Sequence, residues 1–173
     1  VAESQYSNTD QIETEIQLAD SGYGQGQVLV NPIHLASLYT MYPNRGKVLK
    51  PYLVYKDTPE PEVWIEDACT PETAEIVEDG MKAVISSEHG TGHAAMRSDI
   101  TLAGKTGTAE IKASKEDTSG TELGWFAVYT ADADMQKPVL MVSMVEDVKN
   151  AGGSGLVVRK SRDVLGAYIP SGQ

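Results

Sequence analysis

Three strand-like segments late in the sequence constrain the fold more than any other feature. They run over residues 101–111, 122–130 and 139–146. The connections between them, 112–121 and 131–138, are polar and rich in Asp, Ser or Gly, which is typical of hairpin loops. Because consecutive strands joined by such loops pair side by side, the sequence predicts an antiparallel meander.

Helix signals flank these segments on both sides. Asn31-Pro32 and Thr70-Pro71 each combine a capping residue with a proline, whose missing N–H costs nothing at the first helical position. Ser154 is predicted to cap a last helix. The stretch 139–142 is apolar on both faces, so we expect helices to cover that strand on both sides. The predicted fold class is therefore α/β of the α+β type, with an antiparallel sheet of about three to five strands flanked by helices.

The first third of the chain gives weaker signals. Residues 50–55 have the pattern of a short strand, and residues 62–65 that of its hairpin partner. The first twenty residues are mostly polar, so we expect an irregular approach to the body of the domain. No repeat or low-complexity tract divides the chain, and we expect one continuous folded unit.

Charge and length limit the classes of partner. The chain has 25 acidic and 14 basic residues, a net charge of −11, and the basic residues are scattered. This argues against a nucleic acid or an anionic membrane surface as partner.

A length of 173 residues permits one domain with a core, or half of a larger domain. No apolar stretch approaches the roughly 20 residues that span a bilayer, and the first residues resemble neither a signal peptide nor a Met-initiated start, so we expect the protein to continue upstream.

The sequence gives no convincing metal or cofactor site. Cys69 is the single cysteine, which permits neither an internal disulfide nor a thiolate cluster. His89 and His93 are four residues apart, but glycines separate them where a helix should end. The glycines of segment 22–26 could suggest a phosphate loop, but an apolar run and Pro32 come before the next helix. We therefore expect no metal and no cofactor.

Lys105-Thr106-Gly107-Thr108, on the first of the three strands, is the strongest candidate binding feature. An ammonium and two hydroxyls beside a glycine can bind a carboxylate, and a strand edge can pair with an extended peptide. A solvated strand lysine followed by a bulge would give the same short pattern. The motif by itself therefore leaves both interpretations open.

Longer strings carry a family resemblance. Gly104-Lys105-Thr106-Gly107-Thr108-Ala109-Glu110, followed on the next strand by Gly124-Trp125-Phe126, resembles the third motif and adjoining strand of penicillin-binding transpeptidases. Asp20-Ser21-Gly22-Tyr23-Gly24-Gln25-Gly26 and the helix after it are similar to the same family. The resemblance is closest to class B penicillin-binding proteins, including the low-affinity type behind methicillin resistance, and extends from about Leu18 to the end. It implies the C-terminal part of the penicillin-binding/β-lactamase-like transpeptidase fold.

The two other motifs of that family are missing from the sequence. No serine has lysine three positions later or asparagine two positions later. Tyr6-Ser7-Asn8 could be a second motif of the Tyr-x-Asn kind, but its position favours a lead-in loop. We therefore expect residues 1–173 to be a partial transpeptidase domain that lacks the upstream Ser-x-x-Lys and Ser-x-Asn portion and is inactive by itself.

The resemblance implies roles for particular residues. Lys105 and Thr108 would be catalytic: Lys105 would supply positive potential and help proton transfer, and the Thr108 backbone N–H would be one of two oxyanion donors. The residues implied in substrate binding are Thr106, Gly107, Thr108, Tyr23 and Gln25. The threonine hydroxyls would hold the substrate carboxylate, and Gly107 would leave room for its backbone.

The resemblance also implies a parent protein. It would cross-link peptidoglycan through an acyl-serine, with a stem peptide or a β-lactam as ligand. An N-terminal helix would anchor it at the extracytoplasmic face of the bacterial membrane, where it would work with other cell-wall synthesis proteins. A β-lactamase or β-lactam sensor, which shares the third motif, and a non-catalytic binding module are the alternatives. Because a half-domain leaves apolar faces uncovered, self-association of the chain is a further hypothesis.

Overall fold

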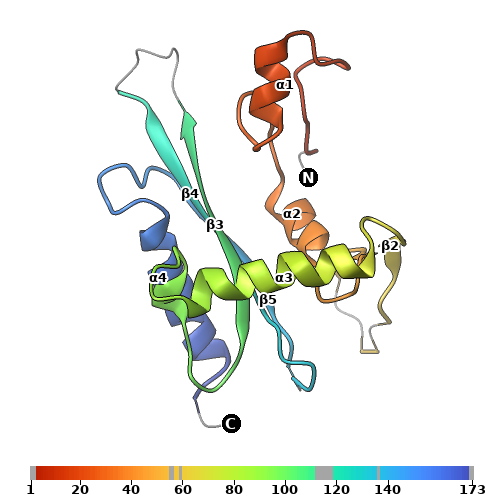
Figure 1. The fold of residues 1–173 in the computed structure, drawn as a ribbon, viewed down its shortest axis with the longest axis vertical. Helices are drawn as coiled ribbons and strands as arrows, with labels where there is room; N and C mark the ends of the chain where they lie inside the picture. The colour runs from red at the N-terminus through yellow and green to blue at the C-terminus, as the bar shows by residue number, and fades with distance from the viewer. Residues whose placement is uncertain (1–2, 55–56, 59, 112–118, 136, 172–173) are drawn as a thin grey trace.

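A three-stranded antiparallel sheet with the order β3-β4-β5 is the centre of the fold (Figure 1). The computed structural model describes residues 3–54, 57–58, 60–111, 119–135 and 137–171. In chain order the elements are α1 (Glu15–Ser21), α2 (Pro32–Tyr39), β1 (Val48–Leu49), β2 (Val63–Ile65), α3 (Pro71–Ser86), the 3-10 turn η1 (His93–Ala95), β3 (Leu102–Ile111), β4 (Thr121–Thr130), β5 (Leu140–Val145) and α4 (Ser154–Tyr168).

The pairing of the large sheet confirms the predicted meander. β3 and β4 pair from Leu102 with Thr130 to Ile111 with Thr121, and β4 continues to β5 from Gly124 with Val145. Each strand thus neighbours the next in sequence, as hairpin connections require. Most of the predicted loop 112–121, residues 112–118, lies outside the described residues. The mixed helix and antiparallel-sheet architecture confirms the predicted fold class.

Apolar clusters on both faces of this sheet form the core. On one face, Phe126 and Val128 of β4 pack with Val157 and Leu165 of α4. On the other, Tyr129 packs with helix residues of α2 and α3, and α3 crosses the sheet in front (Figure 1). Burying such side chains contributes about 1.5–3 kcal/mol each. This two-sided burial fixes the register of β4, because a slip of one residue would exchange its faces.

The prediction that helices cover β5 on both faces is confirmed, although the strand is incompletely buried. Leu140 packs against one cluster and Met141 against the other, so helices do approach both faces. The strand is nevertheless only half-buried, and Met144 is exposed. Among the described residues, β5 has β4 on one side and no second strand on the other. An apolar run alone therefore did not indicate how completely the strand is covered.

Two of the predicted helix starts are confirmed, and a third is wrong in detail. The Asn31 side chain accepts a hydrogen bond from Ile33 N at α2, and that of Thr70 from Thr73 N at α3. At α4 the cap is Gly153, with φ 60°, and Ser154 is already helical. A glycine accepts this left-handed backbone, which a serine rarely adopts.

Two assignments in the first third of the chain are corrected. α1 occupies part of the region predicted to be irregular: Thr14 Oγ1 accepts from Gln17 N, and Gln17 Oε1 accepts from Glu13 N, a reciprocal cap visible as Thr-x-x-Gln in the sequence. The strand predicted at 50–55 lies instead at β1, before it, and pairs with β2. Lys50 N still donates to Glu62 O at 2.9 Å, but Pro51 has no N–H to continue the ladder.

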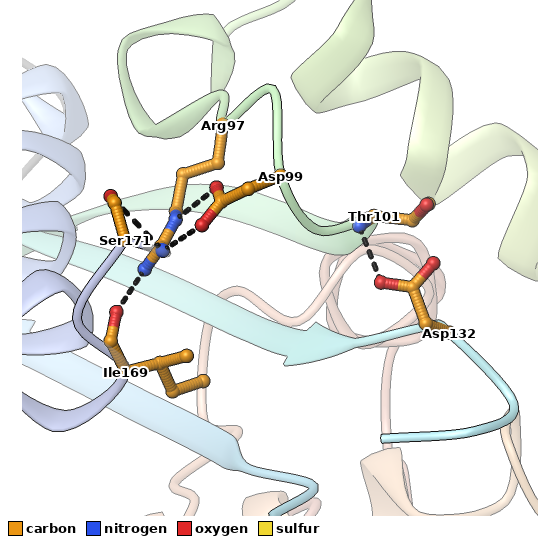
Figure 2. Close-up of polar contacts among 6 residues, drawn as sticks. All are labelled: Arg97, Asp99, Thr101, Asp132, Ile169 and Ser171. Atoms are coloured by element: carbon orange, nitrogen blue, oxygen red, sulfur yellow. Dashed lines mark hydrogen bonds and ion pairs between the residues drawn. The ribbon is translucent and has the colours of Figure 1, made fainter. Parts of the chain in front are cut away.

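Arg97 ties the segment before β3 to the end of the chain (Figure 2). Its guanidinium donates to both carboxylate oxygens of Asp99 and, through Nη1, to the carbonyl oxygen of Ile169 at 2.6 Å. The Arg97 side chain is only 10% exposed. Nearby, Asp132 Oδ2 accepts from Thr101 N at 2.7 Å, which joins the start of β3 to the turn after β4. These contacts join the end of α4 to the segment before β3, and the start of β3 to the turn after β4.

We expect Arg97→Ala to destabilise the chain by about 1–3 kcal/mol, because the charge-assisted hydrogen bonds that it removes are made by a guanidinium side chain that is only 10% exposed. Urea unfolding followed by circular dichroism measures the change. Arg162→Ala is the matched control, since Arg162 pairs with its neighbour Asp163 on the surface, and it should have almost no effect. Equal losses in the two variants would show that the Arg97 contacts are not structural.

The same contact predicts a pH dependence. Hydrogen bonds from Arg97 hold the pKa of the Asp99 carboxyl below its usual value. A carboxylate with a lowered folded-state pKa stabilises the protein above its unfolded-state pKa of about 4 and loses that contribution as the pH falls through the folded-state pKa. The stability gap between the unmodified chain and Arg97→Ala should therefore shrink in urea titrations below about pH 4. A gap that stays constant into strong acid would contradict this.

Candidate functional site

One long edge of β3 faces a groove instead of another strand. β4 pairs with the opposite edge along all ten residues of β3, and no strand among the described residues pairs with this one. Residues of an antiparallel strand direct their N–H and C=O groups alternately to its two edges. Gln25 Nε2 donates to the carbonyl oxygen of Thr108 at 3.2 Å, and Lys105 Nζ to that of Thr106 at 2.7 Å. The main-chain groups of Thr106 and Thr108 therefore face the groove edge.

The segment Gly22–Gly26 forms the opposite wall. Gly24 and Gly26 have φ of 77° and 69°, the left-handed region that glycine adopts without strain, and so the segment turns tightly after α1. Tyr23 Oη donates to Asp20 Oδ1 at 2.8 Å, and this hydrogen bond to a carboxylate raises the pKa of Tyr23. The turn places Tyr23 and Gln25 against β3, although about eighty residues separate them in sequence from that strand.

The groove has a volume of about 210 Å³. Its walls are the segment Gly22–Gly26, one face of α2 with Val30 before it, β3 and β4. The lining residues are Tyr23, Gly24, Gln25, Val30, Leu35, Tyr39, Lys105, Thr106, Gly107, Thr108, Ala109, Trp125 and Ala127. Every site residue predicted from the sequence is among them. Trp125, which stands opposite Gly107 in the register, was expected to be core or groove wall and is wall.

Lys105 dominates the charge of this groove. It is the one charged side chain among the described residues that line it, on a chain whose net charge is −11. A single ammonium beside hydroxyls, backbone N–H groups and an aromatic wall is suited to a small ligand with a carboxylate. No serine lines the groove within the described part of the chain, so these walls supply binding groups without a serine hydroxyl.

Thr106 lies differently from the expectation. The alternation of β3 puts its side chain on the face opposite Lys105, and the residue is only 7% exposed. Its hydroxyl oxygen lies 2.7 Å from that of Thr91, in the turn after α3. Thr91 was not predicted to belong to the site, because the pattern Gly90-Thr91-Gly92 indicates only the end of a helix. The structure thus adds Thr91 to the surroundings of the site.

A larger cavity, of about 380 Å³, lies between α3 and the start of β3. Its charged groups are engaged with protein partners: Arg97 binds Asp99 and Asp132 binds Thr101 N (Figure 2), and Lys82 binds Glu78. A ligand would have to displace these partners. This cavity is therefore a weaker candidate than the groove beside β3.

The described residues offer neither a cluster of metal ligands nor a membrane-spanning helix. Within the described ranges, no three His, Cys, Asp or Glu side chains are placed to hold a metal ion. His93 Nδ1 lies 3.0 Å from the carbonyl oxygen of Ile85, a contact that fixes the turn after α3. None of the helices in the described part of the chain has the length and apolarity needed to cross a membrane.

Known proteins resemble this chain along most of its length. Residues 2–165 match the family model described as the penicillin binding protein transpeptidase domain. The chain is 42% identical over 153 residues to penicillin-binding protein 3 of Bacillus subtilis, a match to 88% of this chain and 22% of that protein. It is 32% identical over 164 residues to peptidoglycan D,D-transpeptidase MrdA of Haemophilus influenzae, a match to 86% of this chain and 25% of that protein. The chain thus spans a quarter or less of these curated relatives.

Solved structures show the same fold. Penicillin-binding protein A of Mycobacterium tuberculosis matches 96% of this chain and 38% of its own, with a TM-score of 0.72 and 22% identity. The same protein as an imipenem acyl-enzyme complex matches 97% of this chain with a TM-score of 0.71. The narrower expectation of a low-affinity, methicillin-resistance type stays a prediction. On the strength of the matching domain model and relatives, this chain belongs to the penicillin-binding protein transpeptidase domain family, among the class B proteins.

Proposed function

We propose that this chain forms the carboxylate-binding part of a serine D,D-transpeptidase domain that cross-links peptidoglycan. The observation that carries the proposal is the groove in which Lys105 is the charged lining residue, beside the free edge of a Lys-Thr-Gly-Thr strand. The relative from Haemophilus influenzae is named a peptidoglycan D,D-transpeptidase, which supports the reaction class. The imipenem acyl-enzyme of a structural neighbour supports β-lactams as ligands.

The reaction needs a nucleophile from a preceding part of the protein. Its serine Oγ attacks the penultimate D-Ala carbonyl carbon of a stem peptide, the C–N bond to the last D-Ala breaks, and the departing nitrogen takes up a proton. An amine of a neighbouring strand then attacks the acyl-serine, forms an amide and returns a proton to the serine oxygen. This covalent route divides one difficult step into two easier ones. A β-lactam enters the first step and remains on the serine.

In this proposal the groove residues bind and orient the substrate. Lys105 supplies positive potential and assists proton transfer, and the Thr108 N–H faces the edge where the oxyanion forms. The hydroxyls of Thr106 and Thr108 hold the carboxylate, and the flat surface at Gly107 admits the substrate backbone. Tyr23 and Gln25 form the opposite wall, and Gln25 already bonds the Thr108 carbonyl. Loss of one oxyanion donor costs about 2.7–4 kcal/mol of transition-state stabilisation.

The proposed organisation extends beyond these residues. Residues 1–173 form a partial domain, and the preceding part contributes Ser-x-x-Lys and Ser-x-Asn. The parent protein is anchored by an N-terminal helix at the extracytoplasmic face of the membrane, where stem peptides and other cell-wall synthesis proteins are present. The chain alone binds but does not turn over its substrate.

A covalent labelling experiment tests this proposal. We expect benzylpenicillin to add its mass to the full-length gene product but not to residues 1–173 alone, as measured by intact-protein mass spectrometry. A labelled short chain would reveal a nucleophile within it. Absence of the adduct on both proteins would reject the transpeptidase assignment, and rapid release of hydrolysed penicillin would reassign the parent as a β-lactamase.

Gly107→Ala separates binding from folding. An added Cβ at Gly107 would have Trp125 Cβ at 3.5 Å as its nearest neighbour, an ordinary contact, so stability should not fall. The methyl group would occupy the proposed path of the substrate backbone, and acylation of the full-length protein by benzylpenicillin should slow about 10- to 100-fold. Stopped-flow acylation and thermal unfolding provide the two readouts.

Gly104→Ala is the matched control for that experiment. A Cβ at Gly104 would lie 2.8 Å from the Ala127 carbonyl oxygen and 3.1 Å from Phe126 Cε2, so this variant should lose stability. The two variants separate two roles of glycine in β3. Gly107 leaves room for a ligand, whereas Gly104 leaves room for the side chains and backbone of the protein's own core. Normal acylation by a folded Gly107→Ala protein would contradict the assigned role of Gly107.

We further propose that the chain alone self-associates through an apolar groove of about 400 Å³ between α2, β1 and β5. Val142 lines this groove, and Val142→Lys should shift the isolated chain toward monomer in size-exclusion chromatography with light scattering. Val164→Lys is the control, because Val164 is exposed on α4, away from the groove. A monomeric unmodified chain at high concentration would contradict self-association.

A further inference from the structure

Thr91 and Thr106 bring two hydroxyl groups together at the edge of β3. Their Oγ1 atoms lie 2.7 Å apart, although the residues are fifteen positions apart in sequence. Thr106 belongs to the strand and is 7% exposed, whereas Thr91 lies on the surface. Thr91 does not line the groove, so it can act on a bound ligand only through its hydrogen bond with Thr106.

The turn that carries Thr91 is fixed from both sides. Gly90 N donates to Ser87 O at 2.8 Å, and Gly92 N donates to Val84 O at 3.1 Å. A Cβ at Gly90 would lie 2.1 Å from the Val84 carbonyl oxygen, so the turn can pack this closely on α3 only with glycine there. Because α3 in turn packs on β3 through Ile85 and Met81, Thr91 is held in place relative to the strand.

The chemistry of two adjacent hydroxyls gives this contact a direction. Each hydroxyl has one proton to donate and can accept as well. When Thr91 donates to Thr106, the Thr106 proton stays available for a third group. When Thr106 donates to Thr91, its proton points away from any ligand. A carboxylate at the strand edge accepts but does not donate hydrogen bonds, so it selects the first arrangement.

We propose that Thr91 is a positioning residue: its hydroxyl holds that of Thr106 as a donor to the carboxylate of the bound substrate or β-lactam. This inference rests on the proposed function of the groove. It assigns to the turn after α3 a part in selecting ligands that have a carboxylate. Lys105, on the other face of the strand, attracts the same group through charge.

The test compares two ligands that differ only in this carboxylate. Stopped-flow measurements give the acylation rate constants of the full-length gene product with benzylpenicillin and with its neutral methyl ester. We expect Thr91→Val, which keeps the shape but removes the hydroxyl, to slow acylation by the acid about tenfold, the size of one lost hydrogen bond. Acylation by the ester should change less than twofold. Thr91→Ser should restore the rate with the acid.

Controls separate the possible causes. Thr91→Ala repeats the measurement in case the valine disturbs the turn, and thermal unfolding reports whether each variant is folded. Equal slowing with acid and ester, or no slowing with either, would overturn the role of Thr91 while leaving the proposed function intact. Failure of the unmodified protein to react with either ligand would overturn the proposed function, and this inference with it.

Discussion

The pairing of β3 with β4 is the interaction on which the rest of the structure depends. It extends over all ten residues of both strands, and the buried side chains of β4 fix its register from both faces. Leu102 and Ala103 lie in the core at one end of β3, whereas Glu110 and Ile111 are exposed at the other. The Lys-Thr-Gly-Thr motif lies where the strand passes from core to solvent. A rigid strand can therefore present functional groups without being mobile itself.

The free edge of β3 allows a structural strand to serve as a binding surface. An unpaired edge displays main-chain donors and acceptors that another extended chain can use. Here Gln25 occupies one of these acceptors, the Thr108 carbonyl, and the glycine segment and α2 narrow the remaining space to a groove. Lys105 is positively charged, whereas the chain as a whole carries a net charge of −11. Its ammonium attracts a small anionic ligand, and the surrounding negative charge repels a large polyanion.

Local signals predicted those parts of the fold in which chemistry between near neighbours decides the outcome. The proline-containing caps of α2 and α3 and the meander followed directly from residue patterns. Predictions were wrong where a competing local rule applied. Pro51 ended a ladder that apolar residues seemed to extend, Gly153 took the cap position expected for Ser154, and the reciprocal cap at Thr14 formed a helix in a polar segment.

The sequence by itself determined the motif, its strand and the neighbouring strand order, because side-chain alternation and turn chemistry are encoded within short segments. Every residue that the sequence predicted to bind substrate lines the groove. Only the tertiary structure decided that Gln25 bonds the Thr108 carbonyl and that Thr91 meets Thr106. These contacts join segments far apart in the chain, and their geometry follows from how α1, α2 and α3 pack around one sheet, which no local pattern specifies.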